Sequence, residues 1–212
     1  MTLADEIDAA IAALADLSVA PLRSVRRTFS KKLKREPGRE VVSTALSLRS
    51  RGGLSRHFVA CELVRHHPAA HGSLTARDLE SFGTGLDSWA AVDTFATYLS
   101  GPAWREGQVP DSWIHGWARS TDRWRRRAAL VSTVPLNSRT HGGLGDATRT
   151  LRICSLLAAD RDDMVVKALS WALRELAKRD PAAVRGFLKK SKLAPRVVRE
   201  VGNKLRTGKK NP

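Results

Sequence analysis

Hydrophobic residues recur three and four positions apart along nearly the whole chain. Residues 162–180 show the pattern clearly, because their apolar positions are Val165, Leu169, Ala172 and Leu176. This spacing places the apolar side chains on one face of an α-helix. We find no stretch of comparable length that alternates apolar and polar residues, as a half-buried strand would. The pattern therefore predicts an all-α protein.

The predicted helices are short and closely spaced. Most begin at a proline or a capping residue, and the clearest starts are Pro21, Pro37, Thr75, Asp162, Asp180 with Pro181, and Pro195. About ten to twelve helices are expected, which favours an α-solenoid or an irregular helical bundle. Because no strict repeat is visible, any solenoid must be degenerate. One domain over residues 1–206 is the simplest arrangement, followed by a frayed basic tail at 207–212.

Charge narrows the choice of partners. The 212 residues include 37 Lys plus Arg against 21 Asp plus Glu, which gives a net charge of +16. Such an excess repels itself in an isolated protein and favours a polyanionic partner. Nucleic acid is the first candidate. A membrane surface is disfavoured, because no long apolar run and no helix with separate basic and bulky apolar faces occurs.

The cysteines and the first residues indicate the cytoplasm. Cys61 and Cys154 lie within apolar helical patterns, which is typical of buried free thiols in a reducing compartment. The opening residues, MTLADEIDAA, are acidic and amphipathic and lack the basic region of a signal peptide. We therefore expect a cytoplasmic protein.

Aromatic and basic side chains meet in the segment STDRWRRRAALV, residues 120–131. In a helix, Trp124, Ala128 and Val131 would face inward. The arginines would lie along one flank: Arg123, Arg126 and Arg127. Neighbouring guanidinium groups repel each other, so a phosphate between them is a natural partner. A merely solvated basic face explains the pattern equally well.

Trp171 lies outside the apolar stripe of residues 162–180. It shares a helix face with three cationic residues: Lys167, Arg174 and Lys178. A large aromatic side chain on a basic face favours contact with a sugar or base between phosphates. We therefore expect a nucleic-acid contact here. The basic run at residues 196–210 is either a phosphate-binding helix or a solvated end.

An aspartate stands out in the nearly apolar segment DSWAAVDTFA. Val92, Phe95 and Leu99 would form the apolar stripe of a helix, and Trp89 and Asp93 would lie one turn apart on the neighbouring face. The simple interpretation is an interfacial tryptophan beside a solvated or capping aspartate. The alternative is that a lone negative charge on a basic surface faces a cation.

Other candidate motifs are weaker. HGGLGD at residues 141–146 lacks the preceding strand and following lysine of a P-loop, and it indicates a loop. His66, His67 and His71 lack the carboxylate or cysteine company of a zinc site, so we expect no metal. Three further tryptophans are expected to pack between helices: Trp104, Trp113 and Trp117.

Three motifs together resemble those of the AlkD-type DNA alkylation repair glycosylases. They are W-x-x-x-D at residues 89–93, W-x-R-R at 124–127 and the long motif KALSWALRELAKRDPAAVRGF at 167–187. The similarity covers roughly residues 78–205. The resemblance implies a HEAT-like α-solenoid, curved so that a basic concave face holds duplex DNA. It also implies excision of cationic alkylated purines, chiefly 3-methyladenine and 7-methylguanine, without a metal or cofactor.

Carried over by motif, the resemblance makes Asp93 the catalytic carboxylate. Trp89 and Trp171 would contact the deoxyribose of the lesion, and Arg126 or Arg127 would clamp a phosphate. Chemistry agrees, because a cationic purine leaves without a general acid, and one carboxylate can stabilise the oxocarbenium-like sugar and orient a water. The expected protein is a monomeric, monofunctional glycosylase without lyase activity that works on the nucleoid.

Two features keep alternatives open. Ser88 and Ala90 stand where the family has further aromatic and acidic character, which would weaken the orientation of Asp93 or mark another lesion preference, such as bulky adducts at N3 or N7 of purines. The alternative function is a non-catalytic HEAT-like protein that binds nucleic acid through the same basic surface.

Overall fold

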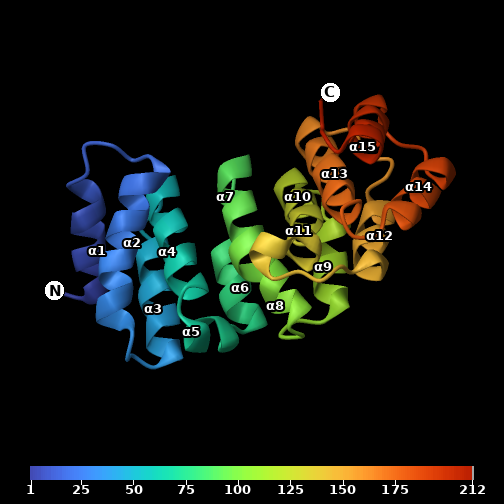
Figure 1. Ribbon diagram of the computed structural model, residues 1–212. Helices are drawn as coiled ribbons and strands as arrows, with labels where there is room; N and C mark the ends of the chain where they lie inside the picture. Colours follow the sequence, from blue (N-terminus) through green and yellow to red (C-terminus); the bar gives the residue numbers. More distant parts are fainter. Residues whose placement is uncertain (212) are drawn as a thin grey trace. The chain divides into compact units, whose positions relative to one another are not determined.

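The structure is a computed structural model that describes residues 1–211. All the secondary-structure elements assigned in that range are helices, which confirms the all-α prediction (Figure 1). Twelve of the α-helices have seven residues or more, in agreement with the ten to twelve expected. Three shorter ones, α5, α8 and α11, span too few residues to show a periodic pattern. The chain divides into two compact units, and the second begins at Asp87.

The first unit contains six helices. They are α1 (Leu3–Ala12), α2 (Val19–Leu33), α3 (Gly38–Arg49), α4 (Leu54–Arg65), α5 (Pro68–Gly72) and α6 (Ala76–Gly83). Most pack on helices one or two places away along the chain, such as α1 on α2 and α3, α2 on α4, and α3 on α4, while α6 packs on α3. This neighbour-to-neighbour packing is the pattern of an α-solenoid.

The second unit contains the remaining helices. They are α7 (Trp89–Phe95), α8 (Gly101–Arg105), α9 (Asp111–Ala118), α10 (Arg123–Val131), α11 (Val134–Asn137), α12 (Ala147–Leu156), α13 (Asp163–Leu176), α14 (Pro181–Lys190) and α15 (Pro195–Thr207). A π-helix, η1 (Ala96–Ser100), joins α7 to α8, and a 3-10 turn, η2 (Arg139–His141), follows α11.

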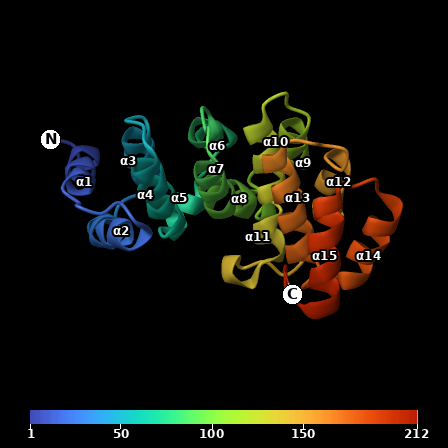
Figure 2. The ribbon, with the colours of Figure 1, turned by 90° about the horizontal axis from the view of Figure 1, so that it is seen from above.

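The core of the second unit is built around α10 and α13. Helix α13 lies between α10 and α15 in both views (Figures 1 and 2), and α10 also packs on α7 and α9. The predicted stripe of α13 is fully buried: Val165, Leu169, Ala172 and Leu176. The stripe predicted for α7 and η1 is buried as well: Val92, Phe95 and Leu99. Both apolar patterns are confirmed, and they bring the adjoining faces of α7, α10 and α13 together.

Local signals are confirmed at several other positions. Trp104 is buried and donates its indole N–H to Asp111 at 2.8 Å, and the rings of Trp113 and Trp117 lie 4.1 Å apart. Trp117 also contacts Phe95 of α7, with ring centres 5.7 Å apart. Trp104 and Trp117 therefore pack between helices, as expected, whereas Trp113 is only partly buried and its ring contact lies within α9. The two cysteines are buried free thiols, also as expected.

The helix starts predicted from the sequence lie within about two residues of the starts in the structure. Thr75 begins α6 through a capping box with Asp78, whereas α2 begins at Val19, before the proline at position 21. Among the described residues, no helix is both long enough and apolar enough to span a bilayer.

The predicted single domain and its frayed tail stay predictions. Thr207 is the last residue of α15, and the Nζ atom of Lys210 lies 3.4 Å from the carboxylate of Glu200 on that helix. Pro212 lies outside the described residues. The predicted curvature and basic concave face concern the whole chain and also stay predictions.

Candidate active site

Helix α7 presents the tryptophan and the aspartate of the first motif. Ser88 caps the helix, and its hydroxyl accepts a hydrogen bond from the backbone N–H of Ala91 at 3.4 Å. Trp89 is 59% exposed, which is unusual for an indole. Thr97, in the π-helix that follows, donates its hydroxyl to the backbone carbonyl of Asp93 at 2.6 Å. Irregular turns of this kind occur frequently at functional sites.

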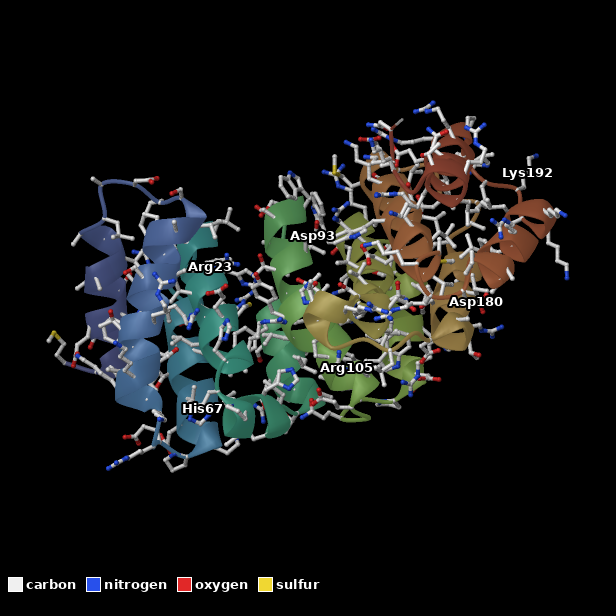
Figure 3. All side chains as sticks on the ribbon, viewed as in Figure 1. Arg23, His67, Asp93, Arg105, Asp180 and Lys192 are labelled. Carbon is white, nitrogen blue, oxygen red and sulfur yellow. The ribbon has the colours of Figure 1, made fainter. Side chains whose placement is uncertain are left out.

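Arg127 of α10 holds the carboxylate of Asp93 with two hydrogen bonds. The Nε atom donates to Oδ1 at 2.9 Å, and NH2 donates to Oδ2 at 2.7 Å. A third guanidinium nitrogen, NH1, donates to the backbone carbonyl of Met164 on α13 at 2.6 Å. The paired geometry fixes both the position and the rotation of the carboxylate. Helices α7, α10 and α13 of the second unit therefore meet at this ion pair. Asp93 is labelled in Figure 3.

The expectation that the arginines of α10 lie along one flank is wrong for Arg127. Its side chain is 7% exposed and turns toward α7, while the side chain of Asp93 is 17% exposed. Arg126 instead donates to Asp160 at 2.7 Å and to the carbonyl oxygens of Ser120 and Thr121. Consecutive residues of an α-helix point about 100° apart, and this separation sends the two arginines to different partners.

The remaining predictions for α10 are confirmed in part. Ala128 and Val131 are buried, as expected for the inward face. Trp124 is only partly buried, and the guanidinium group of Arg123 lies 4.9 Å from the centre of its ring. This contact is a cation–π interaction, which favours an indole at the edge of the core.

Burial sets the ionisation of Asp93. Removal from water raises the pKa of the Asp93 carboxyl above its usual value, while the hydrogen bonds and the positive charge of Arg127 oppose that shift. The charged carboxylate thus depends on Arg127. A carboxylate held away from bulk water acts more strongly on a nearby cation than a solvated one does.

Helix α13 carries the second predicted tryptophan. Trp171 is partly exposed and lies two turns after Met164, about 10 Å along the helix axis. The three cations expected on its face are paired locally. Lys167 contacts Asp163 and Lys178 contacts Glu175, each at 2.6 Å, and Arg174 donates to the Ser170 hydroxyl at 3.2 Å. The Lys167–Asp163 pair is exposed to solvent and therefore weak, so a phosphate can replace its carboxylate. In the other pair Lys178 is exposed, whereas Glu175 is only 13% exposed.

Sequence reasoning missed the partner of Asp93. Arg127 is the last arginine before the buried run from Ala128 to Val131. Its place next to that run is the signal that it faces the core. Nothing in the sequence indicates the Met164 carbonyl as an acceptor, because backbone acceptors are available at every residue. The Asp160 carboxylate lies 34 residues from Arg126, so local spacing does not indicate it either.

The histidine cluster has a structural role at one position. His67 caps α5, and its Nδ1 atom accepts a hydrogen bond from the backbone N–H of Ala70 at 3.2 Å. Within residues 1–211, no three His, Cys, Asp or Glu side chains are grouped as a metal ion would require.

Comparison with known proteins identifies the family. A solved structure described as a predicted DNA alkylation repair enzyme from Enterococcus faecalis is similar, with a TM-score of 0.73 and 15% identity over 97% of this chain and 93% of that one. At this identity the likeness shows a shared fold. No curated protein matches the chain. The sequence model of the DNA alkylation repair enzymes matches residues 14–205. The chain therefore belongs to the DNA alkylation repair enzyme family and has a role in the repair of alkylated DNA.

Proposed function

We propose that the protein is a DNA glycosylase that hydrolyses the N-glycosidic bond of cationic alkylated purines in duplex DNA. The supporting observation is the carboxylate of Asp93, fixed by Arg127 beside the exposed indole of Trp89. A catalytic carboxylate must be placed accurately and partly removed from water, and both conditions hold at this position.

The proposed reaction needs one acidic residue. An N3- or N7-alkylated purine already carries a positive charge, so it leaves with the electrons of the glycosidic bond and needs no proton. Positive charge then develops on C1′ and the ring oxygen of the deoxyribose. The Asp93 carboxylate stabilises that charge and orients the water that adds to C1′. The products are the free base and an abasic site, and the phosphodiester backbone stays intact.

The tryptophans and Arg127 serve the same step. The faces of Trp89 and Trp171 contact the deoxyribose and attract it as it becomes positive. Arg127 keeps Asp93 in the ionised form and in one orientation, which replaces the orientation that an acidic residue at position 90 would provide. No pocket that encloses the base is required, because the chemistry takes place at the sugar.

Binding to duplex DNA rests on the positive charge of the chain. The net charge of +16 attracts the phosphate backbone, and each phosphate contact releases counterions. On α13 the contacts are Lys167, Arg174 and Lys178, which surround Trp171. Next to the lesion, the proposed phosphate clamp is Arg126, because Arg127 is buried and its guanidinium group is held by Asp93 and by the Met164 carbonyl.

A non-catalytic DNA-binding protein is the second candidate. The observation that favours it is that both oxygens of Asp93 already accept hydrogen bonds from Arg127, as in a purely structural ion pair. The two functions differ in one respect. A protein that only binds phosphates gains affinity when an acid on its binding surface is removed, whereas a glycosylase loses its reaction.

Purified protein incubated with methylated duplex DNA is expected to release 7-methylguanine and 3-methyladenine. The freed bases are separated by chromatography and compared with DNA incubated alone. A chelator in the reaction should leave the rate unchanged, and strand breaks should appear only after heating or alkali. Tight binding to the duplex with no base release above background would favour the non-catalytic protein.

A further inference from the structure

A pocket lies in the second unit at the C-terminal end of α13. It has a volume of about 520 Å³. Its lining comes from the loop that includes η2 and from the last turn of α13 and the residues after it: Asn137, Ser138, Arg139, Thr140, Glu175, Lys178 and Arg179. Three cations and one acid give this lining a net charge of +2. The loop continues into the glycine-rich motif HGGLGD, which the proposed reaction does not use.

Two arginines hold the loop through hydrogen bonds to its backbone carbonyl oxygens. Arg179 donates to the carbonyl oxygens of Asn137 and Gly143, at 2.8 Å and 2.5 Å. Arg105 of α8 donates to the carbonyl oxygens of Pro135 and His141. Binding to a loop that is already ordered costs less conformational entropy than binding to a mobile one.

Close packing fixes the loop at Gly143. A Cβ atom added there would lie 2.3 Å from the backbone oxygen of Pro135, which no other residue type can accommodate. The backbone N–H of Gly143 also donates to the carbonyl oxygen of Ser138 at 2.8 Å. The loop therefore has one conformation, and that conformation is set before any ligand arrives.

The groups in the pocket suit a phosphate. The hydroxyls of Ser138 and Thr140 lie 2.9 Å apart and can turn toward a ligand. Arg139 is exposed, and within residues 1–211 no hydrogen bond or ion pair holds its side chain. Lys178 contacts one oxygen of Glu175 at 2.6 Å, and the other oxygen of Glu175 is buried without a partner among the described residues. Guanidinium, ammonium and hydroxyl groups together are the usual donors to phosphate oxygens.

The pocket lies on the same face of α13 as the proposed DNA contacts. Lys178 lies in the turn just past the end of α13, seven residues after Trp171 and fourteen after Met164, which correspond to about 10 Å and about 21 Å at the helical rise. Each strand of B-DNA has one phosphate per 3.4 Å of axis. A strand that passes Trp171 and continues along α13 therefore reaches the pocket about three to six nucleotides from the lesion.

We propose that this pocket binds a single backbone phosphate of the DNA, at that distance from the excised base. The inference rests on the proposed function, because it takes Asp93 and Trp171 to mark the lesion. The contact sets the register of the strand on the protein and carries no sequence information.

Single methylphosphonate substitutions along a duplex test the proposal. The duplex carries an uncleavable tetrahydrofuran abasic analogue at the lesion position, so binding is measured without excision. With the wild-type protein, affinity should fall by about tenfold when one phosphate three to six nucleotides from the analogue is neutralised. With Arg139→Ala, this drop should disappear while the drops at other positions remain. A scan that is identical in both proteins overturns the proposal.

Glu175→Gln should change the affinity for duplex DNA in the opposite direction to Arg139→Ala. It removes the negative charge from the pocket and releases Lys178, so the affinity for unmodified duplex should rise and the salt dependence should steepen. Arg139→Ala should lower the slope of log affinity against log salt by about 0.9. Damage to the fold can only weaken binding, so a rise in affinity with Glu175→Gln cannot come from damage. Weaker binding by Glu175→Gln contradicts the proposal.

Inorganic phosphate and dAMP distinguish the DNA backbone from a small ligand. Titration of either one, with binding observed on the amide resonances of residues 138–143, should show affinity only in the millimolar range and displacement by duplex DNA. Tight binding that duplex DNA does not displace would assign the pocket to a free nucleotide and overturn the proposal. Base release from methylated DNA is measured separately. If no base is released, the methylphosphonate scan still shows whether the pocket binds a phosphate.

Discussion

Asp93→Asn is expected to lower the rate of 7-methylguanine release by about 10²- to 10³-fold while leaving duplex binding nearly unchanged. Asparagine has the same shape and can still accept a hydrogen bond from Arg127, so the local structure should persist. What is lost is the negative charge that faces the sugar in the transition state. Release is measured in single-turnover reactions with excess protein, and binding is measured on an uncleavable duplex.

Asp160→Asn is the matched control for Asp93→Asn. Asp160 forms an ion pair of the same kind with the neighbouring arginine, Arg126, at 2.7 Å. This substitution removes the charge of one partly buried carboxylate from the surroundings of α10 without touching Asp93. Excision by Asp160→Asn should be no slower than that of the wild type. Equal rates for the wild type and Asp93→Asn would reject the catalytic role of Asp93.

Arg127→Met is expected to slow excision and to move its pH dependence. Arg127 is the group that opposes the effect of burial on Asp93. Without it, the pKa of the Asp93 carboxyl rises further, so a larger fraction is protonated and inactive. Activity already falls as the pH drops through the raised pKa of Asp93, and this acid limb should lie at higher pH in the variant. Rates measured from pH 5 to 8 reveal the shift.

The same variant should be less stable, in a pH-dependent way. Removing one partner of a buried ion pair costs about 3–5 kcal/mol, because it leaves an uncompensated charge. Protonation of Asp93 removes that charge, so the loss should be smaller at acid pH than at neutral pH. Denaturant unfolding at both pH values measures it. Arg127→Lys keeps the charge without the paired hydrogen bonds, and it should restore the pH profile more than the rate. An unshifted acid limb in Arg127→Met would contradict the dependence of Asp93 on Arg127.

The helical fold could be predicted because local patterns determine it. The stripes around Leu99 and Leu169 follow from apolar periodicity alone, and both are buried in the structure. Start signals such as Thr75 and Asp162 are equally local, since a cap bonds to its own first turn. Short elements without a full period, such as η2 and α11, gave no comparable signal.

The pairing at the candidate site could not be predicted in the same way. Asp93 and Arg127 are 34 residues apart, and their contact depends on how α7 packs against α10. Solvent exposure was the natural expectation for an arginine next to two others. The apolar run that follows Arg127 was the one opposing signal. The motif therefore predicted the residue types of the site, whereas the packing of three helices determined which arginine contacts the aspartate.

The pocket beside η2 was also beyond sequence reasoning. HGGLGD predicted a loop, which is confirmed by η2 and the residues after it. The lining, however, combines this loop with Glu175 and Lys178 at the end of α13, about 40 residues later. Arg179, which holds the loop to α13, looks in sequence like one more basic residue on a basic helix.

The central claim is that Asp93 meets a sugar that becomes positively charged. Its most direct test compares two uncleavable duplexes, one with a cationic pyrrolidine ring in place of the lesion sugar and one with a neutral tetrahydrofuran ring. The wild-type protein should bind the pyrrolidine duplex at least about tenfold more tightly, since it mimics the charge of the transition state, and Asp93→Asn should bind both duplexes equally. Equal affinity of the wild type for the two duplexes, or the same preference in Asp93→Asn, would contradict the claim.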